Sequence, residues 1–349
     1  MRAKIAVMTE DAPDLNALDE AGRILKEGGL VAFPTETVYG LGGNALDPGA
    51  SMRIYKAKGR PSDNPLIVHI ASMEDLYRIA ADVPAAAERL AERYWPGPLT
   101  MIFPKKDIVP SETTGGLDSV AVRFPDHKIA RELILRAGGF VAAPSANTSG
   151  RPSPTLASHV SEDLGERIDM IIDGGQVSIG LESTIVDFTE EIPVVLRPGF
   201  LNLQMLEEVL GEVRMDPGLS SENEHVRPKA PGMRYRHYAP KAELTIIEGD
   251  PAAVQMEIRT RTSREIEDGR KVGIICTEES RNVYPNGNVV CIGSRAQEET
   301  IAHHLYEVLR GFDDSGVDVI YSESFYTPKM GQAIMNRLLK AAGHRVVEV

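Results

Sequence analysis

The stretch FPTETVYGLG at residues 33–42 decides how the first half of the chain is interpreted. It closes a short apolar run, Leu30–Phe33, that predicts a buried strand. Residues 40–45, GLGGNA, fit the dinucleotide-binding pattern G-x-G-x-x-A. That pattern needs a strand before it and a helix that starts at the glycines, but Pro34 stands in the strand region and Asp47-Pro48 interrupts the helix. A dinucleotide-binding fold is therefore not predicted, and the chain has no G-x-x-x-x-G-K-[ST] motif of a P-loop enzyme.

The elements around this stretch mix helices and strands without a strict alternation. Apolar residues at helical spacing predict helices over 15–27, 48–58 and 127–137. Besides Leu30–Phe33, apolar runs predict strands at 66–70, 99–103, 120–124, 140–143, 170–173, 183–188 and 194–197. The irregular order favours a mixed, twisted sheet in an α/β fold for this half.

Length and composition predict more than one domain. A chain of 349 residues exceeds one typical core. Residues 213–241 are rich in Pro, Gly, Ser and charge, which is typical of a linker. Beyond the linker, predicted strands at 244–247, 272–276, 289–292, 319–321 and 345–349 alternate with helices at 252–267, 296–311 and 331–342. We therefore expect a first domain over 1–212, the linker over 213–241 and a small Rossmann-like parallel α/β domain over 242–349.

Charge and cysteine content narrow the class of protein. Lys and Arg number 38 against 51 Asp and Glu, which gives a net charge of −13. Such a surface repels nucleic acid on average but allows a small anionic substrate in a basic pocket. Cys276 and Cys291 are expected to be buried free thiols, and no Cys–His cluster has the spacing of a zinc site. Acidic residues at 10–11 interrupt any secretory signal, and no apolar run could span a membrane, so a cytoplasmic location is expected.

Two loops carry residues suited to a polyphosphate. Lys58 and Arg60 stand at the end of a predicted helix, and Asn64-Pro65 fixes an irregular turn after them. The loop SANTSG, 145–150, can turn tightly and offer backbone N–H groups to an anion. Each loop also has an ordinary interpretation, an exposed cationic helix end or a helix cap. Neither loop is decisive without the other.

Three further features carry charge in unusual places. His69 lies in a predicted strand, where a hydrogen-bonded core histidine is the ordinary interpretation. Arg123 lies between Val122 and Phe124 and needs an anionic partner, either a structural carboxylate or the carboxylate of a ligand. Residues 225–241 hold five Lys or Arg and no carboxylate, so they form either a solvated linker or a segment that packs down over an anion.

Taken together, these residues resemble the threonylcarbamoyl-AMP synthases, in their longer two-domain form with a YrdC-type catalytic domain. The matching signatures are residues 34–41, the K-x-R of 58–60, and the stretches 64–66, 145–147, 182–184, 196–199 and 231–240. The resemblance implies that L-threonine, bicarbonate and ATP, with Mg²⁺, give threonylcarbamoyl-AMP and pyrophosphate. It also implies a transient partner, a tRNA threonylcarbamoyl transferase complex that modifies the adenosine beside the anticodon.

The resemblance also assigns residues to each substrate. The L-threonine site comprises Thr37, His69, Arg123, Ala143 and Ser183. The ATP site comprises Lys58, Arg60, Asn64, Ser119, Ser145, Asn147, Ser153, Arg197 and Tyr238. Lys58, Arg60 and Arg197 are the expected catalytic residues, which stabilise charge at the α-phosphate. The YrdC-like catalytic domain is expected over 1–212, with the linker 213–241 as a lid over the active site, where Tyr238 folds over the nucleotide. No protein metal ligand is expected, and Glu36 and Glu182 receive no role.

Two other classes of protein compete with this interpretation. The first is an RNA-binding module without nucleotide chemistry, because the YrdC-type sheet resembles double-strand RNA-binding folds. The net charge of −13 and the few aromatic residues oppose it, and strong direct binding of nucleic acid is not expected. The second is the related carbamoyl-transfer protein of hydrogenase maturation. It needs zinc-finger segments, for which two cysteines are too few.

Overall fold

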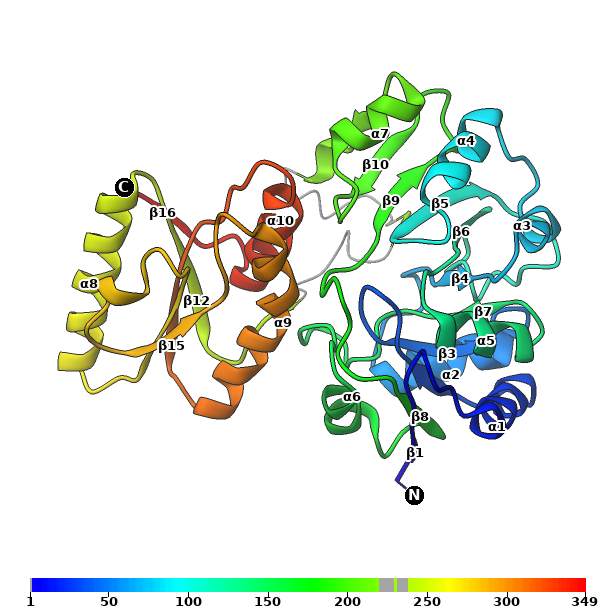
Figure 1. Cartoon of the computed structure of the whole chain (residues 1–349), viewed down its shortest axis with the longest axis horizontal. Coiled ribbons are helices and arrows are strands. Elements are labelled where there is room, and N and C mark those ends of the chain that lie inside the picture. The colour runs from blue at the N-terminus through cyan, green and yellow to red at the C-terminus, as the bar shows by residue number, and fades with distance from the viewer. Residues whose placement is uncertain (1, 220–228, 231–237) are drawn as a thin grey trace. The chain divides into compact units, whose positions relative to one another are not determined.

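A computed structural model of the whole chain describes residues 2–219, 229–230 and 238–349. The chain divides into two compact units, and Figure 1 labels most of their helices and strands. The first comprises Met1–Ser149, Ser153–Ser178 and Glu182–Tyr235. The second comprises Gly150–Pro152, Ile179–Leu181 and Arg236–Val349.

The first unit contains the larger sheet. Its strands are β1 (Lys4–Val7), β2 (Val31–Phe33), β3 (Gly40–Asn44), β4 (Ile67–His69), β5 (Leu99–Pro104), β6 (Ser119–Arg123), β7 (Val141–Ala142), β8 (Met170–Asp173), β9 (Thr184–Asp187), β10 (Val194–Arg197) and β11 (Arg214–Met215). Its helices are α1 (Leu15–Lys26), α2 (Pro48–Lys58), α3 (Met73–Ile79), α4 (Ala85–Tyr94), α5 (Lys128–Arg136), α6 (Ala157–Leu164) and α7 (Leu203–Leu210), with a short 3₁₀ turn at Pro217–Leu219.

The strands of this sheet run in mixed directions. In the described residues the order is β1-β8-β2-β3-β7-β4-β6-β5-β9-β10-β11. β4 pairs with β6 in parallel, whereas β5 and β7 lie antiparallel to their neighbours β6 and β4. β9 is parallel to β5 and antiparallel to β10. The sheet is therefore mixed, as the irregular order of elements predicted.

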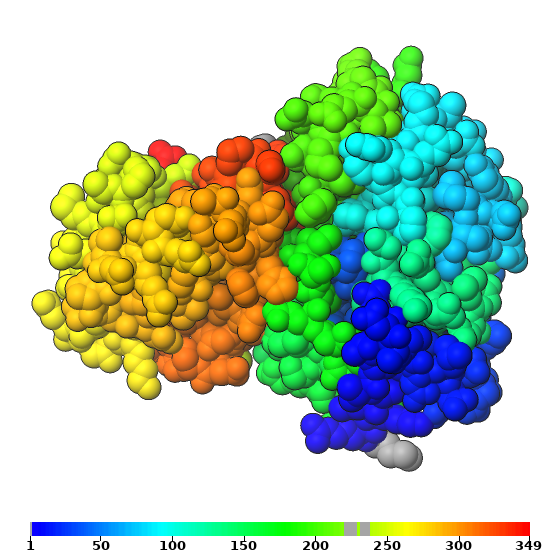
Figure 2. Space-filling model, in the orientation of Figure 1, coloured from blue at the N-terminus to red at the C-terminus, as the bar shows by residue number. Residues whose placement is uncertain are grey.

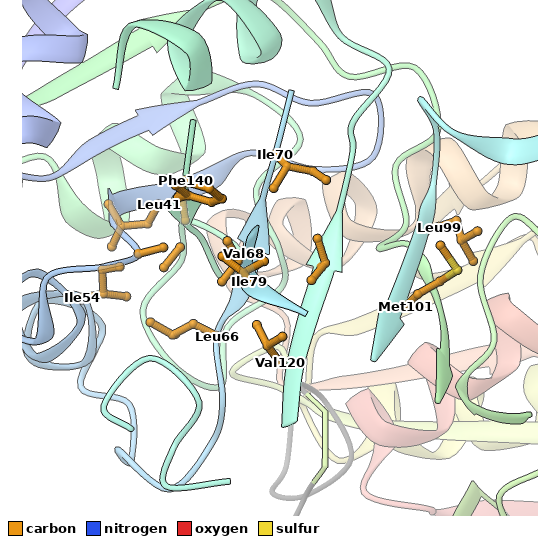
Figure 3. Packing of buried hydrophobic residues seen from close by; sticks show 14 of the residues in the cluster. Leu41, Ile54, Leu66, Val68, Ile70, Ile79, Leu99, Met101, Val120 and Phe140 are labelled. Carbon is orange, nitrogen blue, oxygen red and sulfur yellow. The ribbon is translucent and has the colours of Figure 1, made fainter. Parts of the chain in front are cut away.

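Both faces of this sheet are covered. Successive residues of a strand point to opposite faces, and Ala32 and Phe33 accordingly belong to different apolar clusters. One cluster joins the sheet to α2, α3, α4 and α6, and Figure 3 shows part of it around Val68 and Leu41. The other lies under α1 and α5, which pack against each other. The central strands are buried on both sides, so polar side chains at their ends stand out as candidates for function.

Helix boundaries follow from local chemistry. Asp14 caps α1 by accepting a hydrogen bond from the amide of Ala17. Asp47 caps α2 in the same way from the amide of Gly49, and Pro48 occupies the first turn. α2 ends where Gly59 adopts a left-handed backbone with φ 63°, and this cap turns the chain after Lys58.

The second unit contains the smaller sheet. Its elements are β12 (Glu243–Glu248), α8 (Pro251–Glu267), β13 (Val272–Cys276), a 3₁₀ turn (Arg281–Val283), β14 (Asn288–Cys291), α9 (Glu298–Ser315), β15 (Val319–Glu323), α10 (Gly331–Ala342) and β16 (Val346–Glu348). Every strand pair is parallel, in the order β14-β13-β15-β12-β16. α8 covers one face and α9 and α10 the other (Figure 1). The space-filling view shows α8, in yellow, at the surface of this unit (Figure 2). The predicted fold class, a mixed sheet followed by a parallel α/β domain, is confirmed.

Several elements differ from the predictions. Gly40–Asn44 is a strand, although its glycines gave no strand signal. α3, α4, α6 and α7 lie where the sequence gave no assignment. The predicted linker, 213–241, begins with β11, which pairs with β10. Of the basic segment 225–241, residues 225–228 and 231–237 lie outside the described residues.

Two residues of the predicted linker, and both cysteines, can be compared with their predictions. The side chain of Lys229 contacts Asp187 and Glu190, at 3.1 and 2.8 Å, and Ala230 is buried among apolar side chains of the larger sheet. Both cysteines are free thiols, as predicted, but only Cys276 is fully buried, and Cys291 is half-buried. Within the described residues, no helix is long and apolar enough to cross a membrane.

Candidate active site

The loop between β2 and β3 is fixed by the hydroxyl of Thr35. This hydroxyl donates to the carbonyl of Val38 at 2.7 Å and accepts from the amides of Thr37 and Val38. The hydroxyl of Ser178 donates to the carbonyl of Glu36 at 3.2 Å, which ties the loop to a distant segment. Hydrogen bonds from a threonine to its own loop make a rigid turn. The side chains of Glu36 and Thr37 are therefore held in buried positions.

Arg123, at the end of β6, meets this loop. Its Nη1 donates to Oγ1 of Thr37 at 2.8 Å, and its Nη2 lies 2.7 Å from Oε2 of Glu36. All three side chains are buried. A buried guanidinium requires an anion. The sequence left open whether that anion is a carboxylate of the protein or of a ligand, and in the structure Glu36 supplies a carboxylate of the protein. Sequence reasoning missed Glu36 as this partner, although Glu36 lies in residues 33–42, the stretch with which the sequence analysis began.

His69 lies beside Arg123 because β4 and β6 run in parallel with these two residues in register. Its Nδ1 lies 3.2 Å from the carbonyl of Ile67, and its ring meets Phe33 edge to face. Burial, and then the charge of Arg123, lower the pKa of His69 to about 3. The imidazole is therefore neutral at physiological pH. Its Nδ1 carries the hydrogen and donates a hydrogen bond to the carbonyl of Ile67.

Arg197, Ser183 and Thr100 form the next group along the sheet. The Nε and Nη2 atoms of Arg197 donate to the carbonyl and hydroxyl of Ser183, at 3.0 and 3.2 Å. The hydroxyls of Ser183 and Thr100 are 2.7 Å apart. The pairing of β9 and β10 shifts register between Val195 and Arg197, and such a bulge re-aims the side chain that follows it. Thr100 pairs with Arg123 across β5 and β6, so this group continues the one around Thr37.

Lys58 organises the loop that follows β7. The ammonium of this buried lysine donates to the carbonyls of Ser145 and Asn147 at 2.5 and 2.6 Å. The amide of Ser149 donates to the carbonyl of Lys58 at 2.9 Å, and the hydroxyl of Ser145 donates to Oδ1 of Asn147. The two polyphosphate loops of the sequence are thus joined to each other. An isolated bridge between Gly40 and Ser145 joins them to the loop of Thr37 as well.

The other predicted site residues lie around these groups. Nη2 of Arg60 donates to the carbonyl of Pro65 at 3.1 Å, and Asn64 is buried beside it. Ala143 follows β7 and is buried, and Ser119 begins β6 half-buried. The hydroxyl of Ser153 donates to Oε1 of Glu182 at 2.5 Å, which gives that carboxylate a partner.

Tyr238 belongs to the second unit. Its backbone is left-handed, with φ 64°, and its ring packs on Tyr306 at 5.1 Å between ring centres. The predicted contact of Tyr238 with a nucleotide stays a prediction.

Comparisons with known proteins show the family to which the chain belongs. The family model described as "Telomere recombination", which covers the Sua5, YciO and YrdC proteins, matches residues 23–199. A second model, described as "Threonylcarbamoyl-AMP synthase, C-terminal domain", matches residues 201–343. The first half therefore has the YrdC-type fold, and the Escherichia coli YciO crystal structure shares it, with a TM-score of 0.53 at 23% identity.

Relatives match nearly the whole chain. The threonylcarbamoyl-AMP synthase of Pyrococcus abyssi is 50% identical over 94% of this chain and 95% of the relative. That of Bacillus subtilis is 50% identical over 94% of this chain and 93% of the relative. The crystal structure of P. abyssi Sua5 complexed with L-threonine covers 100% of both chains, with a TM-score of 0.93 and 47% identity. The chain belongs to the two-domain threonylcarbamoyl-AMP synthase family, and it is an enzyme of the nucleotidyltransferase class.

Proposed function

We propose that this enzyme condenses L-threonine, bicarbonate and ATP into threonylcarbamoyl-AMP and pyrophosphate. The amine of threonine attacks the carbon of bicarbonate, and water leaves to give an N-carboxylate. A carboxylate oxygen of this carbamate then attacks the α-phosphorus of ATP, and the bond to the β-phosphate breaks to release pyrophosphate. The protein's task is to hold crowded anions in line and to neutralise their charge, because no covalent step on the protein is needed.

The observation that carries this proposal is the buried guanidinium of Arg123, held by Thr37. Although Glu36 lies 2.7 Å from this guanidinium, its Nε and Nη2 atoms make no hydrogen bond. They suit the carboxylate of a ligand, because guanidinium and carboxylate form charge-assisted hydrogen bonds. The P. abyssi relative, which aligns over the whole chain, was crystallised with L-threonine. We therefore assign the threonine site to Thr37, His69, Arg123, Ala143 and Ser183.

For ATP we propose the neighbouring groups. Arg197 is fixed on Ser183, and Arg60 stands at the loop after α2, so both offer positive charge to phosphate oxygens. Lys58 shapes the loop of Ser145 and Asn147, whose polar groups suit a nucleotide. Asn64, Ser119 and Ser153 complete the proposed ATP site in the first unit, and the contact of Tyr238 with the nucleotide is proposed from the resemblance alone.

Mg²⁺ enters this proposal only with ATP. Within the described residues, no group of three His, Cys, Asp or Glu side chains could hold a metal ion. That part of the chain therefore offers no carboxylate cage of the kind that Mg²⁺ uses, and the polyphosphate oxygens would supply its ligands. We assign no step to the ion.

The chemistry of the product implies a second enzyme that uses it as a substrate. Threonylcarbamoyl-AMP is a mixed anhydride and hydrolyses readily, so a second enzyme must accept it promptly. We propose a transient transfer to the complex that modifies adenosine beside the anticodon of tRNA, in the cytoplasm, where these substrates occur.

Pyrophosphate release from ATP tests the reaction, assayed with and without threonine and bicarbonate. We expect Arg123→Ala to raise the KM for threonine about 10- to 100-fold, the cost of a charged hydrogen-bond partner. Arg60→Ala should instead lower turnover. Arg23→Ala, on the exposed face of α1, is the matched control. If both site variants behave like this control, the assignments are wrong. If wild-type protein releases no pyrophosphate but binds tRNA with steep salt dependence, the RNA-binding alternative holds.

A further inference from the structure

The buried carboxylate of Glu36 has no function in the reaction as proposed above. It lies 2.7 Å from Nη2 of Arg123, yet neither of its oxygens accepts a hydrogen bond of good geometry. The Nε and Nη2 atoms of Arg123 likewise donate none. Buried polar atoms in folded proteins nearly always have hydrogen-bond partners. The Glu36–Arg123 pair therefore has unused hydrogen-bonding capacity on both its negative and its positive member.

The carboxylate is not needed to hold its own loop. The turn is fixed by the hydroxyl of Thr35, and the contact with Ser178 uses the main-chain carbonyl of Glu36. Burying a charged pair costs desolvation energy that apolar side chains of similar size would avoid. Because the side chain of Glu36 is costly to bury and is not needed for the turn, we infer that it interacts with a ligand.

The pair matches one class of ligand in particular. An α-amino acid carries a carboxylate and an ammonium on the same carbon atom. A guanidinium and a carboxylate in direct contact present the opposite charges, also side by side. Thr37 occupies Nη1 of Arg123, so Nη2 and Nε can bind the carboxylate of a ligand. The ammonium of the same ligand then lies next to Glu36.

The charged and titratable neighbours leave this role to Glu36. Burial and the charge of Arg123 keep His69 neutral, so it offers no negative charge. Burial lowers the pKa of His127, at the start of α5, and the charges of Glu10 and Glu36 oppose that shift. The amide of Lys128 and the ring of His127 both contact Glu10, so Glu10 is engaged at the start of that helix.

We propose that Glu36 binds the α-ammonium of the amino-acid substrate and makes the site select α-amino acids over α-hydroxy acids. This inference rests on the proposed function, because it takes the substrate of that site to be an amino acid. A hydroxy acid would leave the buried carboxylate of Glu36 without a cation, and a site rejects a ligand that leaves its buried charges unpaired. Removing the negative charge abolishes this penalty. The substitution Glu36→Gln therefore weakens the binding of threonine while it improves the binding of the hydroxy acid.

Calorimetric titration tests the proposal with two ligands, L-threonine and 2,3-dihydroxybutyrate, which has a hydroxyl in place of the ammonium. Full-length wild type, Glu36→Gln and Glu132→Gln are compared; Glu132 lies on α5, where it pairs with Arg136. The preference for threonine over the hydroxy acid should fall at least about tenfold in Glu36→Gln and stay unchanged in Glu132→Gln. A thermal melt of each variant verifies that it is folded.

If the preference in Glu36→Gln falls by less than this, another group binds the ammonium, such as the carbonyl of Ala143, and the proposal is wrong. Should Glu36→Gln fail to fold, Glu36→Asp replaces it, with the same two ligands and the same threshold, because the shorter carboxylate loses its contact with the ammonium. These titrations contain no ATP or bicarbonate. A wild type that prefers threonine but makes no pyrophosphate would therefore refute the reaction and leave the role of Glu36 standing.

Discussion

Replacing Lys58 by Met tests whether this lysine holds the loop of Ser145 and Asn147 in place. The substitution leaves two carbonyls, 2.5 and 2.6 Å from the ammonium, without their charged donor. A hydrogen bond from a charged group contributes about 1.5–3 kcal/mol, and the relief from burying the ammonium offsets part of the loss. We expect the free energy of unfolding of the first unit to fall by about 2–4 kcal/mol. Lys56→Met, two residues earlier on the exposed side of α2, should change it by less than about 0.5 kcal/mol.

Tryptophan fluorescence during urea unfolding measures this effect in the first unit alone. Trp95 is the one tryptophan of the chain, and its buried indole donates to the carbonyl of Leu99. It therefore reports the first unit and not the second. If Lys58→Met and Lys56→Met unfold at the same urea concentration, Lys58 does not organise the loop, and its proposed effect on ATP must come from its charge alone.

Two further predictions concern the threonine side of the site. The pKa of His69 is lowered, to about 3, so the unfolded chain binds more protons between that pH and 6.5, and stability should be lost as the pH falls through this range. Replacing His69 by Gln should reduce the slope of the free energy of unfolding against pH by about 1.4 kcal/mol per pH unit. Equal slopes for wild type and His69→Gln in the same urea assay would contradict this. Thr35→Val removes the hydroxyl that fixes the loop, so it should weaken threonine binding and lower stability by about 1–3 kcal/mol, whereas Thr35→Ser should retain both. Equal effects of Val and Ser would show that the hydroxyl is not what holds the loop.

The fold was predictable from sequence where hydrophobic pattern and helix signals agree. α2 is the clearest case, because Asp47, Pro48 and Gly59 mark both ends and the structure places it between them. β3 was not predictable, because glycines have low strand propensity. A Cβ at Gly42 would lie 2.9 Å from Cγ1 of Val141 and 3.0 Å from Cε1 of Phe33, so the strand requires glycine there. Tight packing in three dimensions decides such a position, and a single sequence does not display it.

The site was predictable in part for a similar reason. An arginine between two apolar residues of a strand indicated that Arg123 needs an anion. The identity of that anion depended on a loop far away in sequence, whose Glu36 meets Arg123 at the end of β6 only in the folded chain. Thr100 was missed because it lies in an apolar run and gave no sign of the contact with Ser183. The roles that the resemblance assigns to the threonine-site and ATP-site residues, Lys58 and Tyr238 among them, stay predictions.

The most direct test of the proposed reaction follows the carbon of bicarbonate. The purified enzyme is given ¹³C-labelled bicarbonate, L-threonine and Mg-ATP, and the products are separated quickly and weighed by mass spectrometry. We predict one nucleotide product that contains AMP, threonine and a single labelled carbon, formed in step with one pyrophosphate. Pyrophosphate released without threonine, or a product without the label, would contradict the proposal that a threonine carbamate attacks the α-phosphate of ATP at this site.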